Sequence, residues 1–294
     1  MAHNDIRTGA AALAGMAMTF ETGAVRSSDG TTIGYRRIGV GPGLVLVHGA
    51  MMTGQLFEML ARMLADRFTV YIPDRRGRGL SGPFGPDYSI QTEIDDLAAL
   101  LRETNAHNVF GLSSGAVISL HAARQLPQIT KLALYEPPLA TGGVSPTAWS
   151  GRYERDLDAG KTASAFVSVL KGTGDVRGMA VLPRAVLVPL MALFLRMDKG
   201  DTDHGPLREL VPTVRYDIEV VRAAETDLSV FSTLQCDTLL LGGSRSAGYL
   251  GVALRRLAAI LPNARSVTLP GVGHTATFND EKPQLVAAEL REFC

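Results

Sequence analysis

Residues 108–115, which read NVFGLSSG, join two different patterns of apolar residues. The first of these patterns, at residues 108–112, is mostly apolar and predicts a buried strand. Residues 115–126 carry apolar side chains at helical spacing and stop before Pro127. Ser113 lies between the two patterns, in the motif Gly-x-Ser-x-Gly. The sequence therefore predicts a sharp strand-to-helix turn that exposes the hydroxyl of Ser113.

This turn would give Ser113 the surroundings of a nucleophile. The hydroxyl would lie at the N-terminus of the helix, where backbone N–H groups can stabilise an oxyanion. Gly111 and Gly115 suit the turn because larger side chains would clash there. The motif alone is a weak signal in a chain with 31 glycines, but the strand before it and the helix after it make it specific. The alternative is a serine in an ordinary glycine-rich turn.

Outward from this turn, short apolar runs alternate with helical patterns along most of the chain. Such alternation is typical of the α/β class, with a mostly parallel central sheet flanked by helices, and this is the fold class we predict. Strands are expected at residues 31–38, 44–47, 68–72, 108–112, 131–135, 238–241 and 266–269, and helices at residues 56–64, 94–101, 115–126, 252–261 and 282–293.

The alternation is interrupted once, between residues 139 and 229, where the chain has helical patterns and loops but no convincing buried strand. We interpret 139–229 as a helical cap inserted into a core that comprises 23–138 and 230–294. The insertion follows the carboxyl end of a predicted strand, where ligands of open α/β sheets bind. Residues 1–22 are expected to be an N-terminal extension rather than a signal peptide, since they lack a clear positive segment and a long apolar run.

The composition argues against several classes of function. The 29 basic residues equal the 29 acidic ones, so the chain has no general attraction to nucleic acid or to an anionic membrane. Two prolines and an arginine inside the apolar stretch 179–197 argue against a membrane span. The two cysteines, Cys236 and Cys294, form no disulfide or metal-binding pattern, which fits a cytoplasmic location. We expect a small-molecule substrate and no metal or organic cofactor, and a homodimer is left open.

Four motifs, taken in order, give the chain a resemblance to a known family. They are His48-Gly49-Ala50 after one predicted strand, DRRGRGLS at 74–81 after the next, the turn at Ser113, and Gly271-Val272-Gly273-His274 near the end. In the order and spacing of these motifs the chain resembles the α/β-hydrolase superfamily over nearly its whole length. The resemblance implies the α/β-hydrolase fold with a nucleophile elbow. It also implies that His48 braces its loop and that the arginines of 74–81 tie loops together rather than bind phosphate.

The resemblance further implies the groups that act with Ser113. His274 is expected to be the base, because family members carry the base in a glycine-rich loop after the last strand. The backbone N–H groups of Ser114 and Ala50 are expected to form the oxyanion hole, with Met51 as a substitute for Ala50.

The acid of the triad departs from the commonest family pattern. Most relatives carry an aspartate shortly after the strand equivalent to 238–241, but residues 243–246 read GSRS here. Glu136 is our candidate, because it ends the strand after the elbow helix, a position similar to that of the acid in certain haloalkane dehalogenases. Alternatively, Glu136 pairs with an arginine at the cap boundary, and a water or Ser246 orients His274.

The cap is rich in large apolar residues, which can line an apolar substrate pocket. We expect substrate contacts from Met51, Leu112, Leu187, Met191 and Phe194. Such a pocket favours an acyl, aromatic or polyketide-like substrate over a sugar or a peptide. The alternative is that the cap residues pack the cap onto the core.

Together these residues predict a serine hydrolase of the carboxylic-ester class. Ser113 would attack an ester, thioester or lactone of a mainly apolar small molecule, with His274 as base and an acyl-enzyme as intermediate. The serine argues against dehalogenase and epoxide-hydrolase chemistry, which in this fold needs an aspartate nucleophile. One alternative is a non-hydrolytic biosynthetic catalyst, namely a cyclase, lyase or acyltransferase. Another is a small-molecule-binding receptor on the same fold, whose best support is the absent acid at Ser246.

Overall fold

A central sheet of eight strands organises the molecule, in the order β1-β2-β4-β3-β5-β6-β7-β8. The computed structural model describes residues 19–141, 143, 145–174, 179, 181–200, 205–225 and 227–294. The strands are β1 (Glu21–Arg26), β2 (Thr32–Ile38), β3 (Gly43–Val47), β4 (Thr69–Pro73), β5 (Asn108–Leu112), β6 (Lys131–Tyr135), β7 (Asp237–Gly243) and β8 (Ala264–Leu269). β2 is antiparallel to β1 and β4, and all other neighbours are parallel. The predicted fold class is confirmed.

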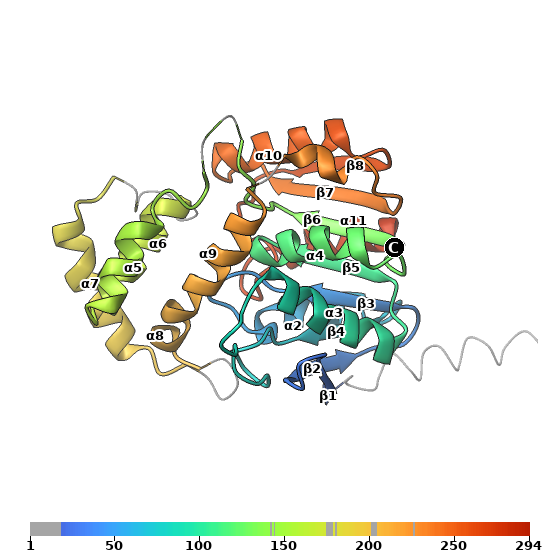
Figure 1. Ribbon diagram of the computed structural model, residues 1–294, viewed down its shortest axis with the longest axis horizontal. Helices are drawn as coiled ribbons and strands as arrows, with labels where there is room; N and C mark the ends of the chain where they lie inside the picture. The colour runs from blue at the N-terminus through green and yellow to red at the C-terminus, as the bar shows by residue number, and fades with distance from the viewer. Residues whose placement is uncertain are drawn as a thin grey trace, which may run out of the picture.

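Helices cover both faces of this sheet (Figure 1). They are η1 (Gly54–Phe57), α2 (Glu58–Leu64), α3 (Ile90–Thr104), α4 (Ser114–Gln125), α5 (Ser150–Asp158), α6 (Thr162–Thr173), α7 (Arg184–Met197), α8 (Leu207–Leu210), η2 (Val211–Thr213), α9 (Val214–Ala223), η3 (Leu228–Phe231), α10 (Gly248–Ile260) and α11 (Pro283–Phe293). α3, α4 and α10 share one buried apolar cluster with the sheet, and α2 and α11 share another on the opposite face.

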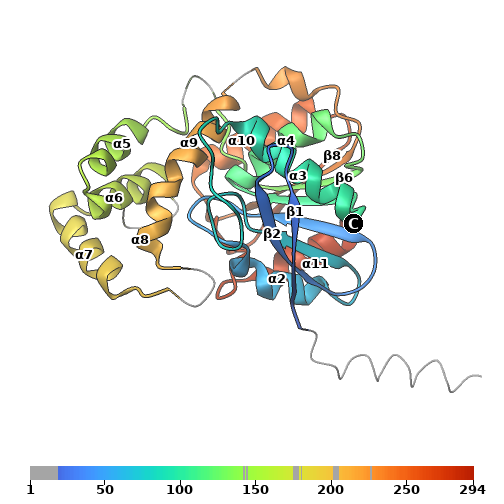
Figure 2. The ribbon, with the colours of Figure 1, turned by 60° about the horizontal axis from the view of Figure 1, so that its bottom comes forward.

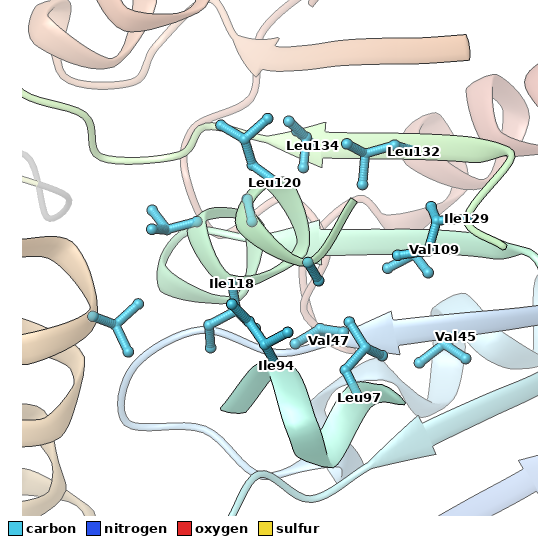
Figure 3. Packing of buried hydrophobic residues seen from close by; sticks show 14 of the residues in the cluster. Val45, Val47, Ile94, Leu97, Val109, Ile118, Leu120, Ile129, Leu132 and Leu134 are labelled. Atoms are coloured by element: carbon cyan, nitrogen blue, oxygen red, sulfur yellow. The ribbon is translucent and has the colours of Figure 1, made fainter. Parts of the chain in front are cut away.

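These two clusters explain why the inner strands are apolar along their whole length. Val45 and Val47 of β3 face α3 and α4, where Figure 3 shows them among side chains of β5, β6 and both helices. Leu44 and Leu46 of the same strand face α2 and α11. Because successive side chains of a strand point to opposite faces, a strand covered on both faces needs apolar residues at every position.

The described residues between 139 and 229, which we call the cap, fold as helices that stand to one side of the sheet (Figures 1 and 2). α5, α6 and α7 share an apolar cluster of their own with the segment from η2 to α9, and Tyr153 and Leu187 lie fully buried within it. α9 also contacts α3 and α4. A cap helix therefore lies beside the point where β5 turns into α4.

β1 is not among the predicted strands, and it begins at Glu21, inside the expected N-terminal extension. Only Val25 of this strand is buried, because β1 is an edge strand that pairs with β2 alone. The alternation of buried apolar residues that would indicate a strand is therefore missing. Residues 1–18 of the expected extension lie outside the described residues.

The apolar stretch at 179–197 corresponds mostly to α7, which has 14 residues with Pro189 inside it. A membrane-spanning helix needs about 20 residues. Among the described parts of the chain, no helix is both long enough and apolar enough to cross a membrane.

Candidate active site

Ser113 lies between the last residue of β5 and the first residue of α4. Its φ of 56° and ψ of −122° are strained for a residue with a side chain. Its N–H donates to the carbonyl of Tyr135 at 2.9 Å. The turn is crowded, because a Cβ on Gly111 would lie 2.6 Å from the Gly115 carbonyl oxygen, and a Cβ on Gly115 would lie 2.4 Å from that of Val47. Glycine is therefore needed at both positions, and Ser113 between them lines the cavity described below.

His274 lies in the loop between β8 and α11. The hydroxyl of Tyr135 donates to the carbonyl of Gly273 at 2.7 Å, so this loop is held to the end of β6. The His274 side chain is 12 % exposed and lines the same cavity as Ser113. The structure therefore brings the predicted nucleophile and base to one site.

Glu136 directly follows β6 and presents its carboxylate to His274. Oε2 lies 2.7 Å from Nδ1 of His274, and Oε1 accepts the N–H of Gly243 at 2.6 Å. Both carboxylate oxygens are thus bonded within the protein, and the side chain is only 1 % exposed. An imidazole that donates from Nδ1 keeps the lone pair on Nε2, which is the nitrogen that can accept a proton.

The position of Glu136 follows from the register of two neighbouring strands. Tyr135 pairs with Leu241, so the next residue lies beside Gly242 and Gly243 at the end of β7. A Cβ on Gly242 would lie 3.2 Å from Oε1 of Glu136. Two glycines at the end of β7 therefore make room for a carboxylate from the neighbouring strand. In the sequence, these two glycines at the end of an apolar strand indicate that space.

The alternatives for the acid find no support in the described contacts. Glu136 bonds to His274 and Gly243 rather than to an arginine. The Oγ of Ser246 is buried and has no hydrogen-bond partner within the described part of the chain, so it does not orient His274. The N–H of Ser246 donates to the carbonyl of Gly243 at 3.2 Å, which closes a turn after β7.

The two predicted oxyanion donors, Ala50 and Ser114, line the cavity together with Ser113. Ser114 is the first residue of α4, so its N–H has no partner within the helix. From the other side, a Cβ on Gly49 would lie 3.1 Å from the Cβ of Ser113, which shows how closely the loop carrying Ala50 approaches the nucleophile. Ala50 lines the cavity, whereas Met51 is not among the described residues of its lining and packs its side chain against the apolar cluster of the cap.

His48 braces this loop and is not positioned as a base. Its Nδ1 donates to the carbonyl of Gly49 at 2.9 Å, and its Nε2 accepts the N–H of Arg75 at 3.0 Å. Burial, together with the nearby charges of Arg78 and Arg75, holds the pKa of His48 well below its usual value. The ring is therefore neutral at pH 7, with both nitrogens engaged.

The arginines of 74–81 form ion pairs inside the protein, as expected for a structural role. Arg76 binds Asp96 through hydrogen bonds of 2.7 and 2.6 Å. Arg75 binds Glu93 in the same two-pronged way, at 3.1 and 2.7 Å. Pairs of this geometry fix the relative positions of the loop and of α3.

Asp217 is a charged residue of the site that no motif marks. It shares the buried face of α9 with Val214 and Ile218, and it lines the cavity. Burial alone would raise its pKa, but the charges of Arg78 and Arg75 outweigh burial and lower the pKa of Asp217. The sequence contains one indication of this site, namely a charged residue among the apolar residues of the buried side of α9.

The cavity beside Ser113 is small and is closed mostly by the cap. Its volume is about 60 Å³. The apolar part of its wall is formed by Pro138, Pro146, Trp149, Val169, Val214, Ile218 and Val221. No lysine or arginine lines it among the residues that the structure describes.

None of the five residues predicted to contact the substrate is among the described residues that line this cavity, and their role stays a prediction. Leu187 and Met191 are buried in the cluster of the cap, and Leu112 is buried in the core. Met51 packs against the cap cluster, and Phe194 is 48 % exposed on the outside of the cap. An apolar stripe does not reveal which neighbour it packs against, and here the alternative of cap packing describes Leu187 and Met191.

Comparison with known proteins assigns the chain to a family. A family model described as "Alpha/beta hydrolase family" matches residues 44–289, and the chain belongs to this family, as the motifs predict. The pimeloyl-[acyl-carrier protein] methyl ester esterase of Stenotrophomonas maltophilia is 30 % identical over 266 residues, covering 87 % of this chain and 93 % of the relative. The 2-(acetamidomethylene)succinate hydrolase of Mesorhizobium japonicum is 25 % identical over 89 % of this chain and 91 % of its own. The crystal structure of an alpha/beta hydrolase from Sphaerobacter thermophilus matches with a TM-score of 0.75 and 34 % identity, over 92 % of this chain and 99 % of that one.

Replacement of Glu136 by glutamine tests the assignment of the acid. Glu136→Gln keeps the shape of the side chain but removes the charge that a triad acid would use to stabilise the His274 imidazolium, so we expect kcat for p-nitrophenyl butyrate to fall by on the order of 10³–10⁴-fold. Ser246→Ala is the matched control and should leave kcat unchanged. The reverse pattern, an active Glu136→Gln with an impaired Ser246→Ala, would move the role to Ser246.

Proposed function

We propose that this protein is a serine hydrolase that cleaves carboxylic esters, or the related thioesters and lactones, through an acyl-enzyme on Ser113. The observation that carries the proposal is the 2.7 Å contact between Glu136 and Nδ1 of His274, at a cavity that Ser113 also lines. This contact leaves Nε2 of the imidazole as the basic nitrogen. The relatives named as an esterase and a hydrolase support the same class of reaction.

Acylation would begin with attack of the Ser113 hydroxyl on the carbonyl carbon of the substrate. Nε2 of His274 takes the hydroxyl proton, while Glu136 stabilises the imidazolium that forms. The carbonyl oxygen becomes an oxyanion held by the N–H groups of Ala50 and Ser114, and one such donor is typically worth about 10²–10³ in kcat. The imidazolium then gives its proton to the departing alcohol, and the acyl group remains on Ser113.

Deacylation repeats these steps with water as the nucleophile. His274 takes a proton from a water molecule, which attacks the acyl carbonyl carbon. The second oxyanion occupies the same pair of N–H groups. The ester bond to Ser113 then breaks, and the serine oxygen recovers a proton from His274.

The cavity favours an uncharged substrate with a small apolar acyl group. Arg75 and Arg78, the arginines near the cavity, are paired with Glu93 and Asp217 and offer no unmatched positive charge. A substrate carboxylate would lose its hydration here without gaining a cation, which is unfavourable. We therefore propose a substrate unlike the succinate derivative in the name of the Mesorhizobium relative.

The receptor alternative loses its main support. It depended on the absence of an acid at Ser246, whereas Glu136 contacts the imidazole of His274 from the neighbouring strand. A protein that only binds a ligand has no need of a strained serine turn at the same cavity as a histidine bonded to a carboxylate.

Ester turnover by the wild type and by Ser113→Ala tests the proposed function. With p-nitrophenyl esters from acetate to octanoate, we expect the wild type to prefer short chains, because the cavity is small. Ser113→Ala should lower kcat by about 10⁶-fold, since no other group can accept the acyl chain. A fluorophosphonate probe should label the wild type at the peptide that contains Ser113. A folded wild type that is inert to esters and probe alike would contradict the proposal and favour the receptor.

Two substrates of equal length test the charge of the cavity. p-Nitrophenyl butyrate and mono-p-nitrophenyl succinate differ in that a carboxylate replaces the terminal methyl group. We expect kcat/KM to be lower for the succinate by roughly 10²-fold or more, because its charge would be buried without a partner. Equal values for the two substrates would mean that the acyl group does not enter this cavity or that a cation reaches it.

A further inference from the structure

Four charged side chains are buried together where α9 meets the core. Arg75 and Arg78 come from the loop after β4, Glu93 comes from α3, and Asp217 comes from α9. Each of these side chains is at most 4 % exposed, and the two positive charges balance the two negative ones. Removal of one charge from such a group leaves its partner unpaired in the interior.

Asp217 bonds directly to the residue that carries one of the proposed oxyanion donors. Its Oδ1 accepts the hydroxyl of Ser114 at 2.7 Å and Nη1 of Arg75 at 2.7 Å. The same Nη1 lies 3.2 Å from Oγ of Ser114, so the serine side chain is held between a carboxylate and a guanidinium. These contacts restrain the first residue of α4, and with it the direction of its N–H.

A second series of contacts leads from Asp217 to the loop that carries the other donor. Arg75 binds Asp217 through its side chain, and its backbone N–H donates to Nε2 of His48 at 3.0 Å. Nδ1 of His48 donates in turn to the carbonyl of Gly49 at 2.9 Å. Gly49 directly precedes Ala50, so Asp217 is connected to both segments of the proposed oxyanion hole.

We propose that Asp217 is a positioning residue for the oxyanion hole, a cap carboxylate that holds the two donor segments in place at Ser113. The inference rests on the proposed serine-hydrolase function. If Asp217 has this role, the two donor segments are held in place only while α9 lies on the core. Without α9, Ser114 and Arg75 lose Asp217, the acceptor that they share. The cap then has a role in the chemistry in addition to enclosing the substrate.

A buried ion pair can also serve only to fasten a cap to its core, and the two roles differ in their kinetics. A residue that only fastens the cap affects stability and, through the cavity wall, KM. A residue that positions the oxyanion donors affects mainly kcat, because the oxyanion forms only on the way through the transition state.

The test compares Asp217→Asn with the matched control Asp96→Asn. Both substitutions remove the charge of a buried carboxylate bound to an arginine, but Asp96 binds Arg76 and does not line the cavity. For Asp217→Asn we expect kcat for p-nitrophenyl butyrate and the rate of fluorophosphonate labelling to fall by about 10²-fold, with KM within about threefold of the wild type. Asp96→Asn should lower the melting temperature and leave kcat unchanged.

Ser114→Ala provides a milder variant, should Asp217→Asn fold poorly. It keeps every charge and the backbone N–H, and removes only the hydroxyl that bonds to Asp217. We expect kcat to fall by about 10-fold with KM unchanged. The double variant should lose less than the product of the two single losses, because both substitutions act on the same contact.

The possible outcomes separate this inference from the proposed function. An active wild type with full kcat in folded Asp217→Asn and Ser114→Ala would overturn the positioning role and leave the hydrolase function intact. Losses confined to KM or to the melting temperature would overturn it as well, because they are the pattern of a fastening residue. A wild type inert toward ester and probe would overturn both.

An independent feature lies on α7, the helix farthest from the core in both ribbon views (Figures 1 and 2). One side of α7 buries Leu187, Met191 and Leu195 in the cap cluster. The other side exposes five more large apolar residues, which we call the outer α7 face: Val186 (53 %), Leu190 (50 %), Leu193 (56 %), Phe194 (48 %) and Met197 (70 %). A helix that is apolar all round is normally covered all round.

We infer that the outer α7 face binds the same face of a second copy of this chain. The five side chains expose on the order of 500 Å², so a symmetric pair that covered them completely would bury about 1,000 Å², the lower limit for a specific interface. The stretch 186–197 that carries this face holds one charged residue, Arg196, which lines a groove with Ala163 and Val188 on another side of α7. The chain has a net charge of zero, which gives no attraction to anionic lipid, so a second copy fits better than a membrane surface.

Sedimentation velocity of the wild type and of Leu190→Glu tests the interface. The wild type should sediment as a dimer at micromolar concentration, and Leu190→Glu as a monomer, because two carboxylates would meet near the centre of the face. Val40→Glu is the matched control: Val40 is 70 % exposed between β2 and β3, and this variant should remain dimeric.

Three results would overturn the interface. They are a monomeric wild type at these concentrations, a dimeric Leu190→Glu, and flotation of monomeric wild type with vesicles of phosphatidylcholine and phosphatidylglycerol. The third result would assign the outer α7 face to lipid.

Discussion

The contact between the carboxylate of Glu136 and the imidazole of His274 is the constraint on which the rest of the site depends. It exists because β6 and β7 are parallel neighbours, so that the residue after β6 lies against the glycines that end β7. The loop after β8 must then come back over the end of β6, where Tyr135 holds the carbonyl of Gly273. The order of strands in the sheet thus determines that Nδ1 of the imidazole, rather than Nε2, meets the carboxylate of Glu136.

The buried charges between α9 and the core fix the positions of the segments around the site and add little to the stability of the fold. A neutral group of four charges contributes little to stability compared with apolar packing, since each charge loses its hydration. Its main effect is to restrict movement, because a guanidinium bound on two sides has almost no freedom to move. Arg75 is bound in this way by Glu93 and Asp217, and it connects a core helix, a cap helix and the loop of His48.

The sequence was most informative where local residues determine the structure. The turn at Ser113 needs only its own glycines and the strand and helix beside it, and the histidine loop is marked by its glycines. Glu136 was accessible because neighbouring parallel strands end at one edge of the sheet. Its role as the acid remains a prediction, although the structure places it in contact with His274. The five residues predicted to contact the substrate lie outside the lining of the cavity, because tertiary packing decides which side of a cap helix meets the cavity. Asp217 was missed for the same reason, since it lies 142 residues from its partner Arg75.

The predicted place of the acid, at the end of β6 instead of in the loop after β7, has a consequence for how such a protein can change over time. In the commonest arrangement the loop after β7 must present a carboxylate, so its length and shape are tied to proton transfer. Here the backbone N–H groups of Gly243 and Arg245 donate to Glu136 and to the carbonyl of Val272, while Tyr249 at the start of α10 lines the cavity. If Glu136 is the acid, as proposed, the side chains of residues 245–249 can therefore change to admit other acyl groups, while Gly243 must stay because its N–H holds Glu136. The choice of substrate can evolve separately from the machinery of turnover.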